Sequence, residues 1–264
     1  TENIVDIINK FQPEIVFHLA AQALVRPSYN DPLTTYSTNI IGSVNVMEAV
    51  RQSKSIRSLI YITSDKCYEN VEQVWGYREN DQLGGRDPYS SSKAACEIIF
   101  SSYNSSFFEH NKLLGAATTR AGNVIGGGDW ALDRIIPDCI RAIENNTPIQ
   151  LRNPKATRPW QHVLEPLAGY LLLSKKLYNN PKTYSGSWNF GPPSHEIRTV
   201  EEVSKIIIDH FGKGSIEKIE VKKQLHEAHL LQLNCDKAHH LLGWYPRWKI
   251  NKSLKLISLV EGKK

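Results

Sequence analysis

The segment Glu14–Ala20, with the sequence EIVFHLA, is a short apolar run of the kind that forms a buried strand. Asp31-Pro32 follows it, and an acidic N-cap with proline at the first helical position predicts that a helix begins there. Ile40, Val44 and Met47 then recur at helical spacing, and the predicted helix runs to about Gln52. A strand followed by a helix is the repeating unit of a parallel α/β sheet.

The same order recurs further along the chain. Ser58–Thr63 (SLIYIT) and Leu114–Arg120 (LGAATTR) predict two more strands. Asp87-Pro88 repeats the capping signal and predicts a helix from Tyr89 to about Glu109. We therefore expect an α/β fold built on a Rossmann-type, doubly wound parallel sheet.

The pattern after about residue 125 is less regular. It predicts a helix near Ile135–Asn145, a short strand at Ile149–Leu151 and a helix from Leu164 to Tyr178. Thr199-Val-Glu-Glu202 is a capping box that predicts another helix. We expect residues 126–264 to form mainly a smaller mixed α/β lobe, with some segments returning to the domain of residues 1–125, and Trp244, Tyr245 and Trp248 to pack that lobe.

A glycine-rich turn is the element that the pattern lacks. A doubly wound nucleotide-binding sheet opens with a strand and such a turn, yet no GxGxxG or GxxGxxG precedes residue 14. Gly126-Gly127-Gly128 lies far along the chain, with no acidic residue at the right spacing after it. We expect the first two βα units, about 60–80 residues at about 30 residues per unit, to be missing. We also expect the isolated chain to be poorly stable and nearly inactive.

Composition narrows the class of protein. The chain has 264 residues, 41% hydrophobic and 22% charged, which excludes a disordered chain. Its net charge of +5 is too small and dispersed to predict nucleic-acid binding. No apolar run is long enough for a membrane span, and the first residues do not resemble a secretory signal. Four cysteines without a CxxC pair predict free thiols in a reducing compartment, hence a cytoplasmic protein, and His239-His240 lacks the spacing of a metal site.

Two clusters carry candidate chemistry. Tyr89 and Lys93 lie four residues apart on one predicted helix, so their side chains share a face. An ammonium beside a phenol, together with a cationic cofactor ring, favours the phenolate and makes tyrosine a usable base. Thr63-Ser64-Asp65-Lys66 ends a predicted strand, where α/β sheets place their ligands. Either cluster alone is more often a surface pair, but together they favour a catalytic site.

Several motifs resemble the extended short-chain dehydrogenase/reductase family. They are HLAAQ (residues 18–22), PYSSSK (88–93) and RAGNVIGGGDW (120–130). TSDKCYEN (63–70), WGYREND (75–81) and RPWQHVLEPLAGYLLL (158–173) are similar to the members of the family that act on CDP-glucose. The resemblance covers residues 5 to 260. It implies that residues 1–125 bind NAD and that the second lobe binds the nucleotide sugar.

The resemblance also implies the reaction. CDP-D-glucose would lose water to give CDP-4-keto-6-deoxy-D-glucose, with NAD reduced and reoxidised within one turnover, for the deoxysugars of bacterial O antigen. Tyr89 would take the proton of the sugar 4-hydroxyl, Lys93 would lower the pKa of Tyr89 and bind the nicotinamide ribose, and Ser64 would orient the 4-oxygen. Asp65 would protonate the departing 6-hydroxyl, and Lys66 would remove the C5 proton. The family also implies a homodimer.

One position departs from the common family pattern. Many sugar-nucleotide dehydratases have Asp-Glu where this chain has Asp65-Lys66, as the CDP-glucose members do. An ordinary lysine is already protonated at neutral pH, so a basic role needs burial or nearby positive charge. Asp65 faces the opposite demand, because an acid must hold a proton. We hypothesise that one proton is shared between Asp65 and Lys66.

The binding residues follow from the resemblance in the same way. The NAD-binding candidates are Leu19, Ala20, Ala21, Gln22, Thr38, Thr63, Tyr89, Lys93 and Ala121. The substrate-binding candidates are Asn123, Arg134 and Arg158, of which the arginines would bind the CDP pyrophosphate by bidentate contacts. The long connection from Lys66 to Asp87 is of lid length, and Trp75, Tyr77 and Arg78 within it could cover the sugar or serve packing.

Two other functions stay open at this point. The chain could be a dehydratase or an epimerase for another sugar nucleotide, or an inactive fragment that serves only as an assembly partner. An epimerase needs only tyrosine, lysine and a hydroxyl residue, whereas elimination of water also needs the acid and base that Asp65 and Lys66 supply.

Overall fold

A four-stranded parallel sheet lies at the centre of the protein, and the computed structural model describes residues 2–219 and 230–261. The sheet has the order β1-β2-β3-β8. Its strands are β1 (Ile15–His18), β2 (Ser58–Ile62), β3 (Gly115–Ala121) and β8 (Gly186–Phe190). The predicted α/β class with a parallel sheet is confirmed, while β8 was not predicted.

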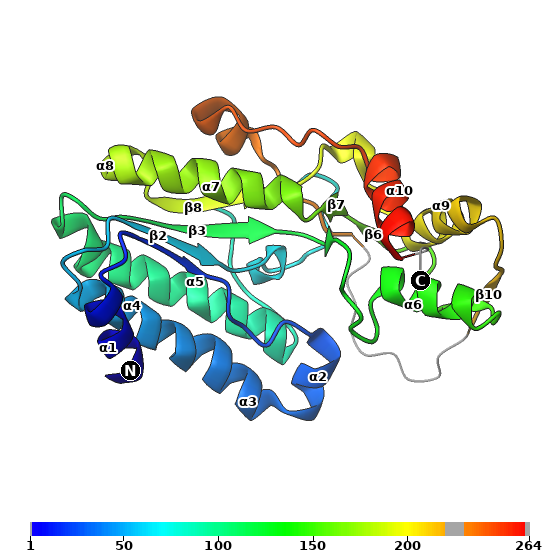
Figure 1. Ribbon diagram of the computed structural model, residues 1–264, viewed down its shortest axis with the longest axis horizontal. Helices are drawn as coiled ribbons and strands as arrows, with labels where there is room; N and C mark the ends of the chain where they lie inside the picture. The colour runs from blue at the N-terminus through cyan, green and yellow to red at the C-terminus, as the bar shows by residue number, and fades with distance from the viewer. Residues whose placement is uncertain (1, 220–229, 262–264) are drawn as a thin grey trace.

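Helices cover both faces of this sheet (Figure 1). On one face lie α1 (Glu2–Phe11), α4 (Gly42–Gln52) and α5 (Pro88–Ser106), and on the other lies α7 (Leu164–Asn179). The helix predicted from Asp31-Pro32 to Gln52 consists of α3 (Pro32–Tyr36), a π-helical segment η1 (Ser37–Ile41) and α4. Short helix α2 (Val25–Asn30) precedes it.

The two predicted aspartate caps are both present. An Asp31 carboxylate oxygen accepts the Thr34 backbone N–H at 3.0 Å, and Asp87 accepts that of Ser90 at 2.9 Å. Each bond satisfies a backbone donor that would otherwise lack a partner in the first turn. The starts of α3 and α5, and with them the place of Tyr89 on its helix, are confirmed.

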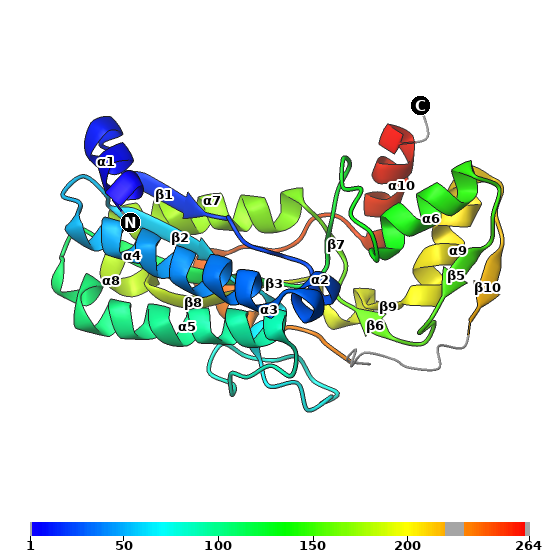
Figure 2. The same ribbon diagram turned by 90° about the horizontal axis from the view of Figure 1, so that it is seen from below.

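The second lobe lies beyond the carboxyl ends of β2 and β3 (Figure 2). Its helices are α6 (Ile135–Glu144), α9 (Val200–Phe211) and α10 (Ile250–Glu261), and the predicted capping box at Thr199 and Glu202 opens α9. Three small sheets complete it: β5 (Ile149–Leu151) with β10 (Ile216–Lys218), β4 (Val124–Ile125) with β7 (Gln161–His162), and β6 (Thr157–Arg158) with β9 (Arg198–Thr199). The remaining short elements are η2 (Asp65–Cys67), η3 (Phe108–His110), α8 (Pro181–Tyr184), η4 (Ser194–Glu196) and η5 (Ala238–Leu242).

Parts of the second half of the chain belong to the central sheet. Strand β8 extends it, and α7 packs across β2 and β3. Trp244 is buried against Phe190 of β8, with ring centroids 4.9 Å apart, and Tyr245 is exposed. The expectation that Trp244 packs the second lobe is therefore wrong, because the chain returns to the sheet before α10.

A buried ion pair joins α5 to β3. Arg120 donates from Nε and Nη2 to the two carboxylate oxygens of Glu97, at 2.9 and 2.8 Å. Burial alone would raise the pKa of Glu97, but the Arg120 charge and the hydrogen bonds from Arg120, Thr63 and Thr118 together outweigh burial and lower it. Thr63 and Thr118 also donate to Glu97, so both carboxylate oxygens are hydrogen-bonded, below the carboxyl end of β2.

We expect Glu97→Gln to destabilise the fold by about 3–5 kcal/mol, because it leaves the Arg120 guanidinium charged, buried and unpaired. The measurement is the free energy of unfolding in urea. Glu48→Gln is the matched control, since Glu48 pairs with Arg51 on the solvent side of α4, where water replaces the lost contact. Equal denaturation midpoints for the two variants would contradict the expectation.

The long connection from Lys66 to Asp87 is anchored to the sheet. Tyr68 donates its hydroxyl to Asn189 Oδ1 at 2.8 Å, and Tyr77 stacks on Tyr68 with centroids 5.1 Å apart. Tyr77 is only 3% exposed, whereas Trp75 is 66% exposed. Tyr77 therefore serves packing, and Trp75 lies at the outer part of the loop.

Of the helices in the described ranges, none has the length and apolar character needed to cross a membrane. The four cysteines are free, as predicted, and all four are buried.

Candidate active site

The carboxyl ends of β1, β2 and β3 meet at one edge of the sheet, as parallel strands require. A cleft of about 1020 Å³ opens there, between this edge and the second lobe. The predicted residues Ser64, Asp65, Lys66 and Tyr89 line it from the sheet side. Asn123, Arg134 and Arg158 also line it, so the structure brings the catalytic and substrate candidates to one cavity.

Tyr89 sits in the first turn of α5, with its side chain 8% exposed. Its backbone N–H donates to Ser28 Oγ at 3.2 Å, and its phenol is hydrogen-bonded to Ser64. Burial raises the pKa of Tyr89 to about 12, the Ser64 hydrogen bond opposes this, and the nearby Asp65 charge adds to it. The pairing of a tyrosine with a serine on neighbouring elements is the arrangement that proton removal from a hydroxyl requires.

Lys93 lies one turn further along the same helix face, and its side chain is buried. Its Nζ donates to the Ile62 carbonyl at the end of β2, at 3.3 Å. Burial lowers the pKa of Lys93, although Cys96 and Glu97 oppose the shift. That Lys93 lowers the pKa of Tyr89 stays a prediction.

Asp65 is the most deeply buried acid of the cleft, at 3% exposure. Its Oδ1 accepts from Ser64 Oγ at 3.1 Å, and its Oδ2 is buried with no hydrogen-bond partner. Burial raises the pKa of Asp65, and the charges of Lys66 and Arg158 only partly counter it. Burial therefore favours the neutral form of the Asp65 carboxyl, which lies beside the half-buried Lys66.

The segment after β1 is held in place by one buried asparagine. Asn39 accepts the Gln22 backbone N–H at 2.8 Å, and its own amide donates to the Gln22 carbonyl and to Ser92 Oγ on α5. Leu19 and Ala20 remain exposed along this segment. Asn39 was not predicted; its position on the helix after HLAAQ is the signal that could have found it.

The other cofactor candidates are placed differently. Thr38 is exposed on the π-helical segment, next to Asn39. Ala121 is the last residue of β3, at the same sheet edge as Ala21 and the rest of the 19–22 segment. The Thr63 hydroxyl donates to Glu97, so the core of the domain already uses that side chain.

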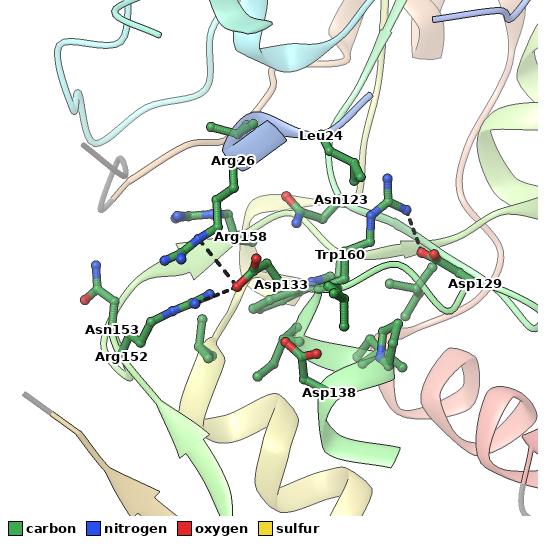
Figure 3. Close-up of a pocket in the computed structure, with 18 of the residues that line it drawn as sticks. Leu24, Arg26, Asn123, Asp129, Asp133, Asp138, Arg152, Asn153, Arg158 and Trp160 are labelled. Carbon is green, nitrogen blue, oxygen red and sulfur yellow. Dashed lines mark hydrogen bonds and ion pairs between the residues drawn. The ribbon is translucent and has the colours of Figure 1, made fainter. Parts of the chain in front are cut away.

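Arginines gather on both walls of the cleft (Figure 3). Arg134 pairs with Asp129 at 2.5 Å, and Arg158 Nη1 donates to the Thr157 carbonyl at 2.7 Å. Arg26 and Arg152 were missed by the sequence analysis, although both line the cleft. A lone arginine after a strand gives no local signal that it will face a cavity.

Within the part of the chain that the structure describes, no three His, Cys, Asp or Glu side chains gather into a group that could hold a metal ion. His239 lies in η5 and stacks on Tyr245, with ring centroids 4.5 Å apart.

The chain is similar in sequence to sugar-nucleotide dehydratases and epimerases. The family model for GDP-mannose 4,6 dehydratase matches residues 1–257. The CDP-glucose 4,6-dehydratase of Salmonella typhimurium is 48% identical over 259 residues, which are 96% of this chain and 72% of that protein. The UDP-glucose 4-epimerase of Mycoplasma pneumoniae is 25% identical over 95% of this chain and 77% of its own length.

Solved structures share the fold over the whole chain. The UDP-glucuronic acid 4-epimerase of Bacillus cereus, in complex with UDP-glucuronic acid and NAD, matches 99% of this chain and 78% of its own with a TM-score of 0.85 at 19% identity. The dTDP-glucose 4,6-dehydratase of Bacillus anthracis, in complex with NAD, matches 99% of this chain and 76% of its own with a TM-score of 0.82 at 22% identity.

Proposed function

The chain belongs to the GDP-mannose 4,6 dehydratase family, and from that premise we propose that it dehydrates CDP-D-glucose to CDP-4-keto-6-deoxy-D-glucose with NAD as cofactor. The observation that carries the proposal is Asp65. Its carboxyl is buried and has a raised pKa, one of its oxygens has no hydrogen-bond partner, and a lysine lies beside it. An epimerase does not need such an acid. It is the acid that elimination of the 6-hydroxyl requires.

The residues of the sheet edge would divide the chemistry between them. Ser64 holds the sugar 4-oxygen, and Tyr89 takes the proton of the 4-hydroxyl as that carbon is oxidised. The 4-ketone makes the C5 proton acidic, and Lys66 removes it. Asp65 donates its proton to the 6-hydroxyl, which leaves as water. A hydride added at C6 and a proton returned to C5 by Lys66 would then give the 4-keto-6-deoxy sugar.

The residues at the ends of β1 and β2 fit a nicotinamide cofactor. The Lys93 ammonium has three donors, and its hydrogen bond to the Ile62 carbonyl uses one, which leaves donors for ribose hydroxyls. Leu19 and Ala20 are exposed at the sheet edge. Leu19–Gln22, Thr38, Ala121, Tyr89 and Lys93 would hold the cofactor. NAD, when bound, would supply the acceptor for the hydride that leaves C4 and the donor from which that hydride reaches C6.

The substrate would lie along the cleft towards the second lobe. Arg134 and Arg158 would bind its diphosphate, since a guanidinium makes paired contacts with phosphate oxygens. Asn123, between β3 and β4, would contact the sugar nucleotide. The positive influence of Arg158 on Asp65 supports a place for Arg158 near the reacting end.

A mass-spectrometric assay tests the proposal. The protein is incubated with NAD and, in parallel, with CDP-, UDP-, GDP- and dTDP-glucose, both as this chain and with a glycine-rich βα segment added before Thr1. We expect loss of one water from CDP-glucose and none from the others. An isomer without loss of water would show an epimerase, and no product from either form would overturn the dehydratase.

We further propose a homodimer through the helices beneath the sheet. Leu33 on α3, Ile41 on η1 and Ile98 on α5 are 79, 56 and 59% exposed, on elements that contact one another. Exposed apolar groups on adjacent helices favour association. We also propose a cytoplasmic enzyme of deoxysugar supply for surface polysaccharide, which agrees with four free cysteines.

Ile98→Asp should convert the dimer to a monomer, because it places a charge within an apolar contact. Sedimentation velocity measures the change in mass. Leu171→Asp on α7 is the control, since Leu171 is 63% exposed on the opposite face of the sheet and should leave the mass unchanged. A dimer that persists in Ile98→Asp would place the interface elsewhere.

A further inference from the structure

The loop of residues 126–134, between β4 and α6, carries two aspartates that face cleft arginines. Asp129 Oδ2 lies 2.5 Å from Arg134 Nη1. Asp133 Oδ1 lies 2.7 Å from Arg152 Nη1 and 3.5 Å from Arg26 Nε. One short loop thus supplies carboxylates to three arginines of the cleft, and Figure 3 shows Asp133 between Arg26 and Arg152.

Asp133 bridges the two walls of the cleft. Arg26 belongs to α2, which packs on α5 at the sheet, whereas Arg152 follows β5 in the second lobe. The backbone of Asp133 has φ 63, in the left-handed region that few residues other than glycine adopt and that aspartate and asparagine tolerate. Such strained positions gather at functional sites.

The two ion pairs of Asp133 are of a kind that a stronger anion can replace. The side chains of Arg26, Asp133 and Arg152 are 34, 39 and 30% exposed, so water screens each pair and each is weak. A diphosphate carries more charge than a carboxylate and offers more acceptor oxygens in the geometry that guanidinium groups prefer. The arginines therefore gain by exchanging Asp133 for a diphosphate.

We infer that Asp133 is an internal counter-ion which the diphosphate of the substrate displaces, and that Arg26 and Arg152 then bind the diphosphate in its place. The inference rests on the proposed function, because it requires the cleft to take a nucleotide sugar. It adds two ligands on opposite walls to Arg134 and Arg158. It also makes Asp133 a residue that weakens binding and restricts the cleft to ligands with enough phosphate charge to displace it.

The test is the affinity for CDP and CMP, measured by isothermal titration calorimetry. Asp133→Asn removes the charge, and asparagine tolerates the same backbone conformation. We expect CDP to bind about three- to tenfold more tightly, which corresponds to two weak ion pairs that no longer compete, and CMP to gain less. Asp138→Asn is the control, because Asp138 lines the same cleft but pairs with Arg141 within α6 at 2.5 Å.

Each other outcome has a defined meaning. Weaker CDP binding by Asp133→Asn would show that Asp133 is itself a ligand and would overturn the inference. Equal tightening of CDP binding by Asp138→Asn would show that the effect comes from the overall charge of the cleft. That result would overturn the inference as well. In an Arg152→Gln background, the gain from Asp133→Asn should shrink; an undiminished gain would contradict the displacement. A wild-type protein that does not bind CDP at all would overturn the proposed function, and this inference with it.

Discussion

Tyr89→Phe should lower kcat by about a thousandfold and leave KM nearly unchanged, because it removes the group that takes the 4-hydroxyl proton and little else. The phenol is buried and bonded to Ser64, so the ring keeps its packing while the hydroxyl is lost. The measurement is the rate of water loss from CDP-glucose, in whichever form of the protein is active in the four-substrate assay.

Tyr36→Phe is the matched control for that variant. Its hydroxyl likewise bonds a serine, Ser91 Oγ on α5 at 2.8 Å, but on the exposed side. We expect full activity from it. A Tyr89→Phe variant that kept more than about a tenth of the wild-type kcat would remove Tyr89 from the role of base.

The pH dependence of kcat/KM also tests the role of Tyr89. Burial raises the pKa of Tyr89 to about 12, and the active form of a base is the deprotonated one, so kcat/KM should rise from neutral to alkaline pH. Positive charge nearby moves that rise to lower pH. Lys93→Met should therefore displace the rise to higher pH, and an unmoved profile would show that Lys93 does not act on the phenol.

Local signals predicted the elements that place this site. Asp31 and Asp87 fix where two helices start, since a carboxylate cap and a proline act within one turn. The apolar segments at Ser58 and Gly115 form strands because they are buried on both faces by helices. Once strands and caps were known, the parallel topology placed Ser64 and Tyr89 at the same edge of the sheet.

Strand β8 could not be predicted from local signals. Its sequence, GSWNF, begins at a glycine with φ 110 and contains two polar residues, so its pattern does not indicate a strand. Its polar positions are satisfied by distant parts of the chain: Asn189 accepts from Tyr68 and donates to the carbonyls of Tyr77 and Asn234. Only the assembled fold supplies these partners.

The site residues also differ in whether local signals predicted them. Residues next to a strand end or on the capped helix were predicted, because their place follows from the sheet. Arg26, Asn39 and Arg152 were not, because each depends on how α2, the π-helical segment or β5 approaches a neighbour.

Lys66 is the proposed base for the C5 proton. Lys66→Met should stop water loss, with at least about a thousandfold lower turnover, while C4 oxidation still occurs in a single turnover. In deuterated water, the wild-type product should carry deuterium at C5 and the variant should incorporate none. Near-ultraviolet absorbance of reduced cofactor follows the first step, and mass spectrometry follows the second.

The reason lies in the environment of Asp65. Burial raises the pKa of Asp65, which favours its protonated form and suits it to the role of acid rather than base. Lys66 lowers that pKa, and its removal therefore leaves Asp65 more firmly protonated. The acid is retained in Lys66→Met, and the failure of elimination reports the missing base.

A charge-preserving variant separates a base from a mere positive charge. Lys66→Arg keeps a cation beside Asp65, but a guanidinium does not give up its proton at any pH at which proteins fold. If Lys66 removes the C5 proton, Lys66→Arg must fail at the same step as Lys66→Met, with oxidation at C4 intact and no deuterium at C5. If Lys66 serves only to tune Asp65, Lys66→Arg restores turnover, and the C5 base must be sought among the other residues that line the cleft.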